Sequence, residues 1–145
     1  MARSNNVLNT GFCPRPDRDN IDLFCSDLTF SAHSPEDVLL PAEKSEKGKF
    51  GHTSVYAPPM SEFDMLRVVL EGEGKEGKED GNHEVVKALG GPAVAFCVKG
   101  EGKLRGGGEQ LECKEGYVFF VGMGTEVDFE AEGGEGLEVY VAYAE

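Results

Sequence analysis

Apolar side chains alternate with small or polar ones along most of the second half of the chain. Val94, Phe96 and Val98 are each flanked by small residues or a lysine, and a similar alternation recurs over residues 137–143. A period of two is typical of β-strands that turn one face towards a core. The pattern predicts strands over residues 63–70, 84–89, 92–100, 102–106, 109–114, 117–122, 125–130 and 137–145.

Seven or eight short strands at this spacing predict an all-β jelly-roll sandwich, which limits exposed sheet edges by wrapping the chain into two layers. The 20 glycines supply the many turns that such a chain needs. A length of 145 residues suits a single domain. We expect residues 1–52 to form an N-terminal segment with a helix and a strap loop, and residues 53–145 to form the β-sandwich.

One segment before the strands has the period of a helix. Ile21, Phe24, Cys25 and Leu28 recur at helical spacing on one face, and Asp19 is a candidate N-cap. This predicts one short helix over about residues 19–28, followed by a polar connection rich in Pro and Lys. The glycine- and charge-rich run at 72–82 contains no apolar residue and predicts a hairpin tip.

The charge balance restricts the class of partner. With 27 acidic against 14 basic residues, the net charge of −13 disfavours nucleic acid and anionic membranes. No secretory leader or membrane-length apolar stretch is apparent, so we expect a cytoplasmic protein. The four cysteines show no metal-binding or redox spacing, and small buried thiols are expected at Cys13, Cys25, Cys97 and Cys113.

Residues 115–129, EGYVFFVGMGTEVDF, resemble the second sequence motif of cupin-type jelly rolls. Gly116, Gly122 and Gly124 take its Gly, Pro and Gly positions, and Val127 stands at the metal-binding histidine. The His-x-His pair of the first cupin motif is absent. The resemblance therefore implies a cupin-like sandwich, and the valine predicts that its pocket holds no metal.

The spacing of the histidines, carboxylates and possible nucleophiles does not indicate a metal or catalytic site. The three histidines, at His33, His52 and His83, have no ligand spacing and are expected to lie exposed in loops. Carboxylate pairs such as Glu130 with Glu132 fall near glycine-rich turns, where solvent is expected to keep both ionised. No nucleophile and base stand at the spacing of a known catalytic pair.

The N-terminal sequence is more specific. MARSNNVLNTGFCPR at 1–15, the helical segment at 19–30 and TSVYAPPMSEFDMLRVVL at 53–70 are similar to consecutive stretches of type I mannose-6-phosphate isomerases. PAVAFCVKGEGKL and KEGYVFFVG match strands near that family's end. Over nearly its whole length, the chain thus resembles the family's C-terminal cupin domain.

This resemblance implies which parts of the isomerase chemistry are present. The family interconverts mannose 6-phosphate and fructose 6-phosphate with a zinc ion, whose ligands lie upstream of the segment that corresponds to Met1. A family arginine aligns with Asn9, a family lysine with Arg15, and a family aspartate with Asn5. Asn9 lacks the positive charge, whereas Arg15 keeps one and is the candidate for binding a sugar phosphate. We expect no catalytic residue and no cofactor in this chain.

Three functions remain open on this basis. The first is a domain-only or truncated relative of the isomerase that is inactive and retains affinity for a sugar or sugar phosphate. The second is a lectin-like carbohydrate-binding sandwich with aromatic residues at Tyr56, Phe63 and Tyr117. The third is an active isomerase whose zinc site is supplied by a separate upstream half.

Overall fold

The computed structural model describes residues 20–26, 32–58, 62–72 and 81–144. The chain divides into two compact units, Met1–Leu39 and Leu40–Glu145. Among the described residues, no helix has the length and apolar character needed to cross a membrane. The prediction of a single domain stays a prediction.

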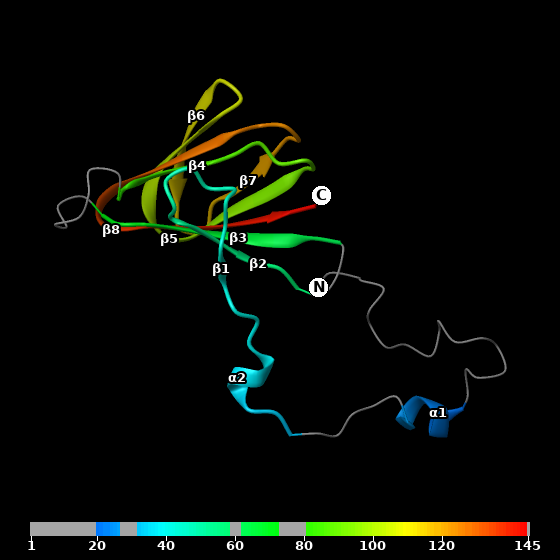
Figure 1. Cartoon of the computed structure of the whole chain (residues 1–145). Helices are drawn as coiled ribbons and strands as arrows, with labels where there is room; N and C mark the ends of the chain where they lie inside the picture. Colours follow the sequence, from blue (N-terminus) through cyan, green and yellow to red (C-terminus); the bar gives the residue numbers. More distant parts are fainter. Residues whose placement is uncertain (1–19, 27–31, 59–61, 73–80, 145) are drawn as a thin grey trace. The chain divides into compact units, whose positions relative to one another are not determined.

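The first unit contains two short helices, α1 at Ile21–Ser26 and α2 at Pro35–Val38 (Figure 1). Helix α1 lies within the predicted range of 19–28, whose other residues at either end are mostly outside the described ones. Helix α2 occurs where we expected an irregular connection. Ser34 forms a capping box with Asp37, since each side chain accepts a hydrogen bond from the other residue's backbone N–H.

The second unit is an antiparallel jelly-roll sandwich, as the sequence pattern predicted. Its strands are β1 (Glu43–Lys44), β2 (Thr53–Tyr56), β3 (Asp64–Leu70), β4 (His83–Val86), β5 (Ala93–Gly106), β6 (Glu109–Lys114), β7 (Val118–Val121) and β8 (Val127–Tyr143). Two strands predicted at 92–100 and 102–106 form the single strand β5, and those predicted at 125–130 and 137–145 form β8.

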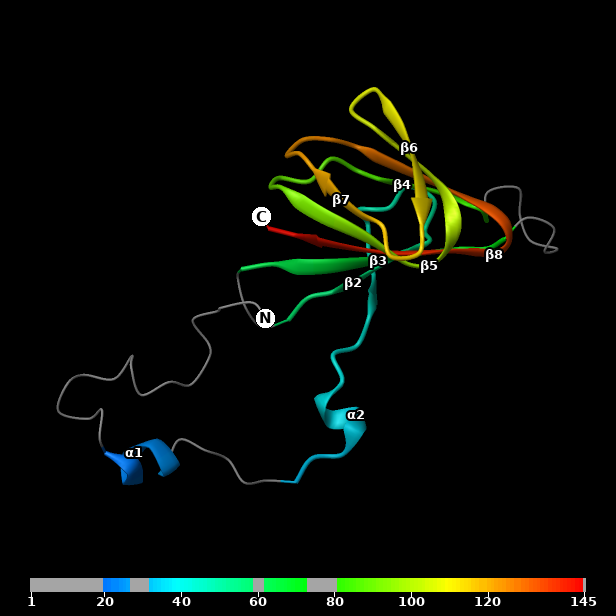
Figure 2. The same cartoon turned by 180° about the vertical axis from the view of Figure 1, so that it is seen from behind.

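Strands β5 and β8 run side by side through both layers of the sandwich. The β5 residues 93–100 and β8 residues 137–143 pair with each other and with β7 and β3, in what we call the first sheet. The β5 residues 101–106 and β8 residues 127–132 pair with β6 and β4, in the second sheet. Figures 1 and 2 show β4 and β6 on one side of the sandwich and β2 and β3 on the other.

Glycines make the bend between the two sheets. The register shifts at Gly100/Glu101, where β8 residues 133–136 are left out of the pairing. Gly100 has a φ of 83°, and a side-chain Cβ there would lie 1.8 Å from the carbonyl oxygen of Gly136. Only glycine permits both the left-handed backbone and this close approach. The bend therefore depends on a residue without a side chain.

One continuous core fills the space between the sheets. The first sheet contributes the aliphatic residues Leu66, Val68, Leu137, Val139 and Val141, and the second sheet contributes Leu104, Val127 and Phe129. On β5 the inward positions of the first sheet are the small residues Ala93, Ala95 and Cys97, whereas Val94 is 43% exposed on the outer side.

Two cysteine thiols belong to this core. Cys97 and Cys113 are 2% and 0% exposed, as predicted, but Cys25 in α1 is exposed rather than buried. Cys13 lies outside the described residues. Burial raises the pKa of the Cys97 thiol and raises the pKa of the Cys113 thiol to about 12. Both thiols stay protonated at neutral pH and are poor nucleophiles.

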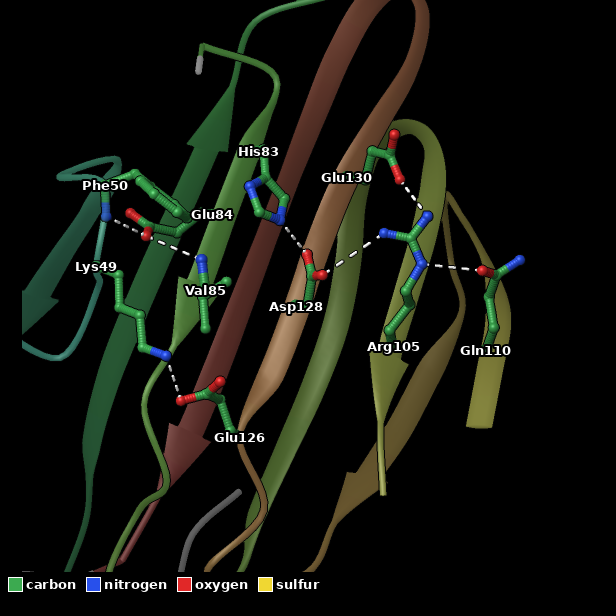
Figure 3. A network of polar contacts seen from close by, with 10 residues as sticks. All are labelled: Lys49, Phe50, His83, Glu84, Val85, Arg105, Gln110, Glu126, Asp128 and Glu130. Carbon is green, nitrogen blue, oxygen red and sulfur yellow. Dashed lines mark hydrogen bonds and ion pairs between the residues drawn. The ribbon is translucent and has the colours of Figure 1, made fainter. Parts of the chain in front are cut away.

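A buried carboxylate attaches the strap, the segment between β1 and β2 (residues 45–52), to the second sheet. Glu84 of β4 is 0% exposed, and its two oxygens accept four hydrogen bonds. The donors are the backbone N–H groups of Phe50 (2.8 Å), His52 (2.7 Å) and Val85 (3.0 Å) and the Thr53 hydroxyl (3.0 Å). Figure 3 shows this carboxylate between Phe50 and Val85. These donors satisfy an ionised group that would otherwise be costly to bury.

Backbone pairing holds the same strap. Lys49 N–H donates to the Val85 carbonyl at 3.0 Å, and Lys87 N–H donates to the Lys47 carbonyl at 2.8 Å. A Cβ on Gly48 would lie 2.3 Å from the Thr53 hydroxyl oxygen and 2.7 Å from a Glu84 carboxylate oxygen. The strap thus lies directly against the carboxylate, and a larger residue at this position would separate them.

We predict that Glu84→Gln lowers the free energy of unfolding by about 2–3 kcal/mol, because an amide NH₂ then faces donors that need an acceptor. Thr53→Val removes a single donor and should cost about 1 kcal/mol. Urea unfolding followed by circular dichroism measures both. Equal stability of Glu84→Gln and the native chain would show that the carboxylate does not hold the strap.

We also predict that iodoacetamide labels Cys25 in the native protein and spares Cys97 and Cys113. At about pH 8 the raised pKa leaves Cys113 almost wholly as the unreactive thiol, and burial excludes the reagent from both. Peptide mass spectrometry with and without denaturant gives the labelling of each cysteine. Rapid labelling of Cys113 in the native state would mean that the core opens readily.

Candidate functional site

The interior position that cupins use for metal is apolar here. Val127 opens β8, is 4% exposed and follows a turn in which Gly124 has a φ of 77°. Its neighbours in the sandwich interior include Val86, Leu89 and Val141. Hydrocarbon side chains offer no ligand atom, so this position cannot hold a cation. Across the described ranges, no three His, Cys, Asp or Glu side chains gather to form a possible metal site, and the expectation of no metal stays a prediction.

The space beside Val127 is also too small for a sugar. The cavity there measures about 10 Å³ and is lined by apolar residues apart from Thr125. A cavity needs about 10–15 Å³ of such space to hold one water molecule, and small-molecule sites are commonly about 300–1,000 Å³. The space beside Val127 is therefore too small to be a ligand pocket by itself.

A larger cavity adjoins this space between β6 and β7, and it shares Val121, Thr125 and Val127 with the smaller one. Its volume is about 190 Å³, and Leu104, Leu111, Phe119 and Val121 give it apolar walls. The single charged residue in its lining is Glu109, which would repel a phosphate group. This cavity suits a small apolar group better than a sugar phosphate.

The histidines are placed in three different settings. His33 is exposed in the first unit, as expected. The expectation of an exposed loop residue is wrong for His83, which begins β4 with its side chain 32% exposed. Its Nε2 atom lies 2.6 Å from Asp128 Oδ1, and its ring lies 5.0 Å from that of Phe50. His52 donates its backbone N–H to Glu84.

The outer side of the second sheet carries a network of ion pairs (Figure 3). Arg105 of β5 donates to Gln110 at 2.9 Å and to Glu130 at 2.5 Å, and it lies 3.5 Å from Asp128. The Glu130 carboxylate raises the pKa of Arg105. Glu132 pairs with Lys103 in the same way. We expected Glu130 and Glu132 to lie as solvated charges in a glycine-rich turn, but both belong to β8 and pair with basic side chains of β5.

A separate groove is lined by lysines that the sequence analysis did not predict to form a site. Its volume is about 590 Å³, and Lys44, Lys49 and Lys87 lie in its wall. Lys49 pairs with Glu126 at 2.6 Å, and Lys87 Nζ donates to the Glu46 carbonyl at 2.6 Å. The strap brings together lysines from distant parts of the sequence, and this makes the groove the more cationic of the two. An anion would still compete with the existing partners of two lysines.

The two residues named from the isomerase resemblance, Asn9 and Arg15, lie outside the described residues, as does Asn5. The roles assigned to these residues therefore stay predictions. Of the three aromatics considered for sugar binding, Tyr56 and Phe63 are partly buried and Tyr117 is 45% exposed.

The chain is similar in sequence to fungal enzymes. Mannose-6-phosphate isomerase from Cryptococcus neoformans is 37% identical over 145 residues, which is 100% of this chain and 30% of the fungal protein. The Aspergillus fumigatus isomerase is 30% identical, again across 100% of this chain and 32% of the relative. Residues 92–145 also match the model of the AraC-like ligand binding domain family. The chain thus spans about a third of the length of the isomerases it matches.

Solved structures show the same fold. Mannose 6-phosphate isomerase from Salmonella typhimurium, in its apo form, aligns over 87% of this chain and 28% of its own, with 19% identity and a TM-score of 0.62. The plu4264 protein from Photorhabdus luminescens aligns over 81% of this chain and 89% of its own, with 10% identity and a TM-score of 0.54. In sequence and in fold, the chain resembles a cupin-like jelly-roll domain of mannose-6-phosphate isomerase.

Proposed function

We propose that these 145 residues form a relative of the cupin domain of mannose-6-phosphate isomerase that is not catalytic by itself, acts in the cytoplasm and retains affinity for a sugar phosphate. The observation that carries this proposal is the similarity over 100% of the chain to 30% of a curated isomerase. The cavity of about 10 Å³ beside Val127 supports it, because that space is too small to enclose the substrate.

We infer the loss of catalysis from particular residues and not from the fold. In the isomerases that this chain resembles, zinc ligands lie in the upstream part, and an arginine lies at the position of Asn9. A neutral amide at this position cannot stabilise the charge that develops on an enediolate or phosphate as a guanidinium does. A chain with these features should bind without turning over its ligand.

Arg15 is the residue we assign to phosphate binding. A guanidinium presents a fork of N–H donors that matches two phosphate oxygens, and it keeps its charge at any physiological pH. The remainder of the chain works against an anion, since the net charge is −13. We therefore expect weak, salt-dependent binding that depends on this one cation.

A lectin-like protein is the second candidate. The exposed ring of Tyr117, 6.4 Å from that of Phe119, lies within the region that matches the AraC-like ligand binding domain. Sugars commonly bind where an aromatic face adjoins hydrogen-bonding groups. This candidate predicts that the phosphate contributes nothing to binding.

Calorimetric titration with mannose 6-phosphate should show binding to the native chain. Arg15→Ala should weaken it about tenfold or more, as expected when a charged hydrogen bond is lost. Lys44→Ala is the matched control, because it removes one positive charge from the lysine groove, and it should leave the affinity within about twofold. Loss of binding in Lys44→Ala alone would place the phosphate in the groove and contradict the role of Arg15.

Two further measurements separate the alternatives. Equal affinity for mannose and mannose 6-phosphate would replace the phosphate-binding proposal with the lectin-like one. Stoichiometric zinc in the purified chain, together with conversion of mannose 6-phosphate to fructose 6-phosphate, would overturn the non-catalytic proposal.

A further inference from the structure

The two outer sides of the sandwich differ in character. On the second sheet, the outward residues of β5 and β8 are charged and paired with one another, such as Arg105 with Glu130 and Lys103 with Glu132. On the first sheet, the outward residues of the same two strands are Val94, Phe96 and Tyr140. One strand pair therefore presents ions on one outer side and hydrocarbon on the other.

The apolar residues form rows across neighbouring strands. Phe120 of β7 pairs with Val94 of β5, which pairs with Ala142 of β8, and Met65 of β3 continues this row. These residues, together with the neighbouring row described below, make up what we call the apolar face. Phe120 is 77% exposed. Large apolar side chains left in water in this number usually mark a surface that another molecule covers.

The neighbouring row continues the apolar face. Val118 of β7 pairs with Phe96, and Phe96 pairs with Tyr140. The Phe96 and Tyr140 rings are stacked with their centroids 5.5 Å apart, and Val118 is 66% exposed. The stacked rings continue the apolar surface across β5 and β8, and an apolar sheet surface suits contact with another sheet.

The charged residues of this face neutralise each other. Arg67 Nε donates to Glu138 Oε1 at 2.8 Å, across the β3 and β8 strands. The Glu138 carboxylate raises the pKa of Arg67, so the guanidinium stays charged and the pair stays intact. In a chain with a net charge of −13, the apolar face is thus a surface without net charge.

We propose that the apolar face binds the same face of a second copy of this chain, giving a symmetric dimer in which two sheets pack face to face. Four strands spaced about 4.8 Å apart and about 20 Å long on average make a face on the order of 400 Å². Two such faces in contact exclude on the order of 800 Å² even before the relief of the side chains is counted, which is close to the smaller specific interfaces.

A second copy fits this face better than other occupants. A symmetric dimer brings each patch against an identical one, and neutral apolar patches satisfy this condition without repulsion between the acidic chains. A basic partner attracted by the net charge would dock on acidic residues instead. A sugar would need polar groups beside the rings, and Arg67 and Glu138 already bond to each other.

Sedimentation velocity and light scattering over about 1–200 µM should show the mass doubling with concentration, as expected for an interface of this modest size. Replacing Val118 and Phe120 together by lysine should raise the dissociation constant about 100-fold or more, because the charges would be buried at the interface. Gln110→Lys adds the same kind of charge on the outer side of the second sheet and should leave the dimer unchanged.

Several outcomes would overturn the proposal. A monomer at every concentration would show that a different molecule covers the apolar face. A dimer that persists after the Val118→Lys and Phe120→Lys changes would place the interface elsewhere. A melting temperature of the native chain that does not rise with protein concentration would contradict the dimer without relying on any variant.

Discussion

The continuous pairing of β5 with β8 is the constraint on which the sandwich depends. Each strand passes from one sheet to the other, and β3, β4, β6 and β7 add to the outer edges of this central pair. The pair can bend only because Gly100 takes a left-handed φ and approaches the backbone of Gly136. Once this register is set, every residue on both strands is assigned to the inside or the outside.

With these inward and outward positions, the space beside Val127 is lined by apolar side chains apart from Thr125. Phe129, Val121 and Val141 line the space beside Val127 and leave it only about 10 Å³. The polar groups have structural roles. Glu84 accepts hydrogen bonds from the strap, and Arg105 donates to the carboxylate of Glu130. A fold similar to that of an isomerase domain therefore need not carry that enzyme's chemistry.

The sequence predicted the strands well because period-two alternation is a local property. It did not predict which set of alternating residues faces the core, because that depends on partners far along the chain. On β5 the small Ala93 and Ala95 are inside and the larger Val94 is outside, the reverse of what size alone suggests. The predicted strand over residues 84–89 began one residue too late, because the alternating pattern does not fix where a strand starts, and His83 was therefore left in a loop. The lysine groove was equally hidden, since the strap brings Lys44 near Lys87 only in the folded chain. The isomerase resemblance, in contrast, came from contiguous motifs and needed no structure.

The central claim is that the space beside Val127 is too small for a sugar phosphate and that such a ligand binds through Arg15. Amide NMR of the ¹⁵N-labelled chain during a titration with mannose 6-phosphate tests this most directly. The account predicts chemical-shift changes around Arg15, with the amides of Val127, Phe129 and Val141 unchanged. Saturable shifts at those three interior residues, of the size seen for direct contact, would contradict it.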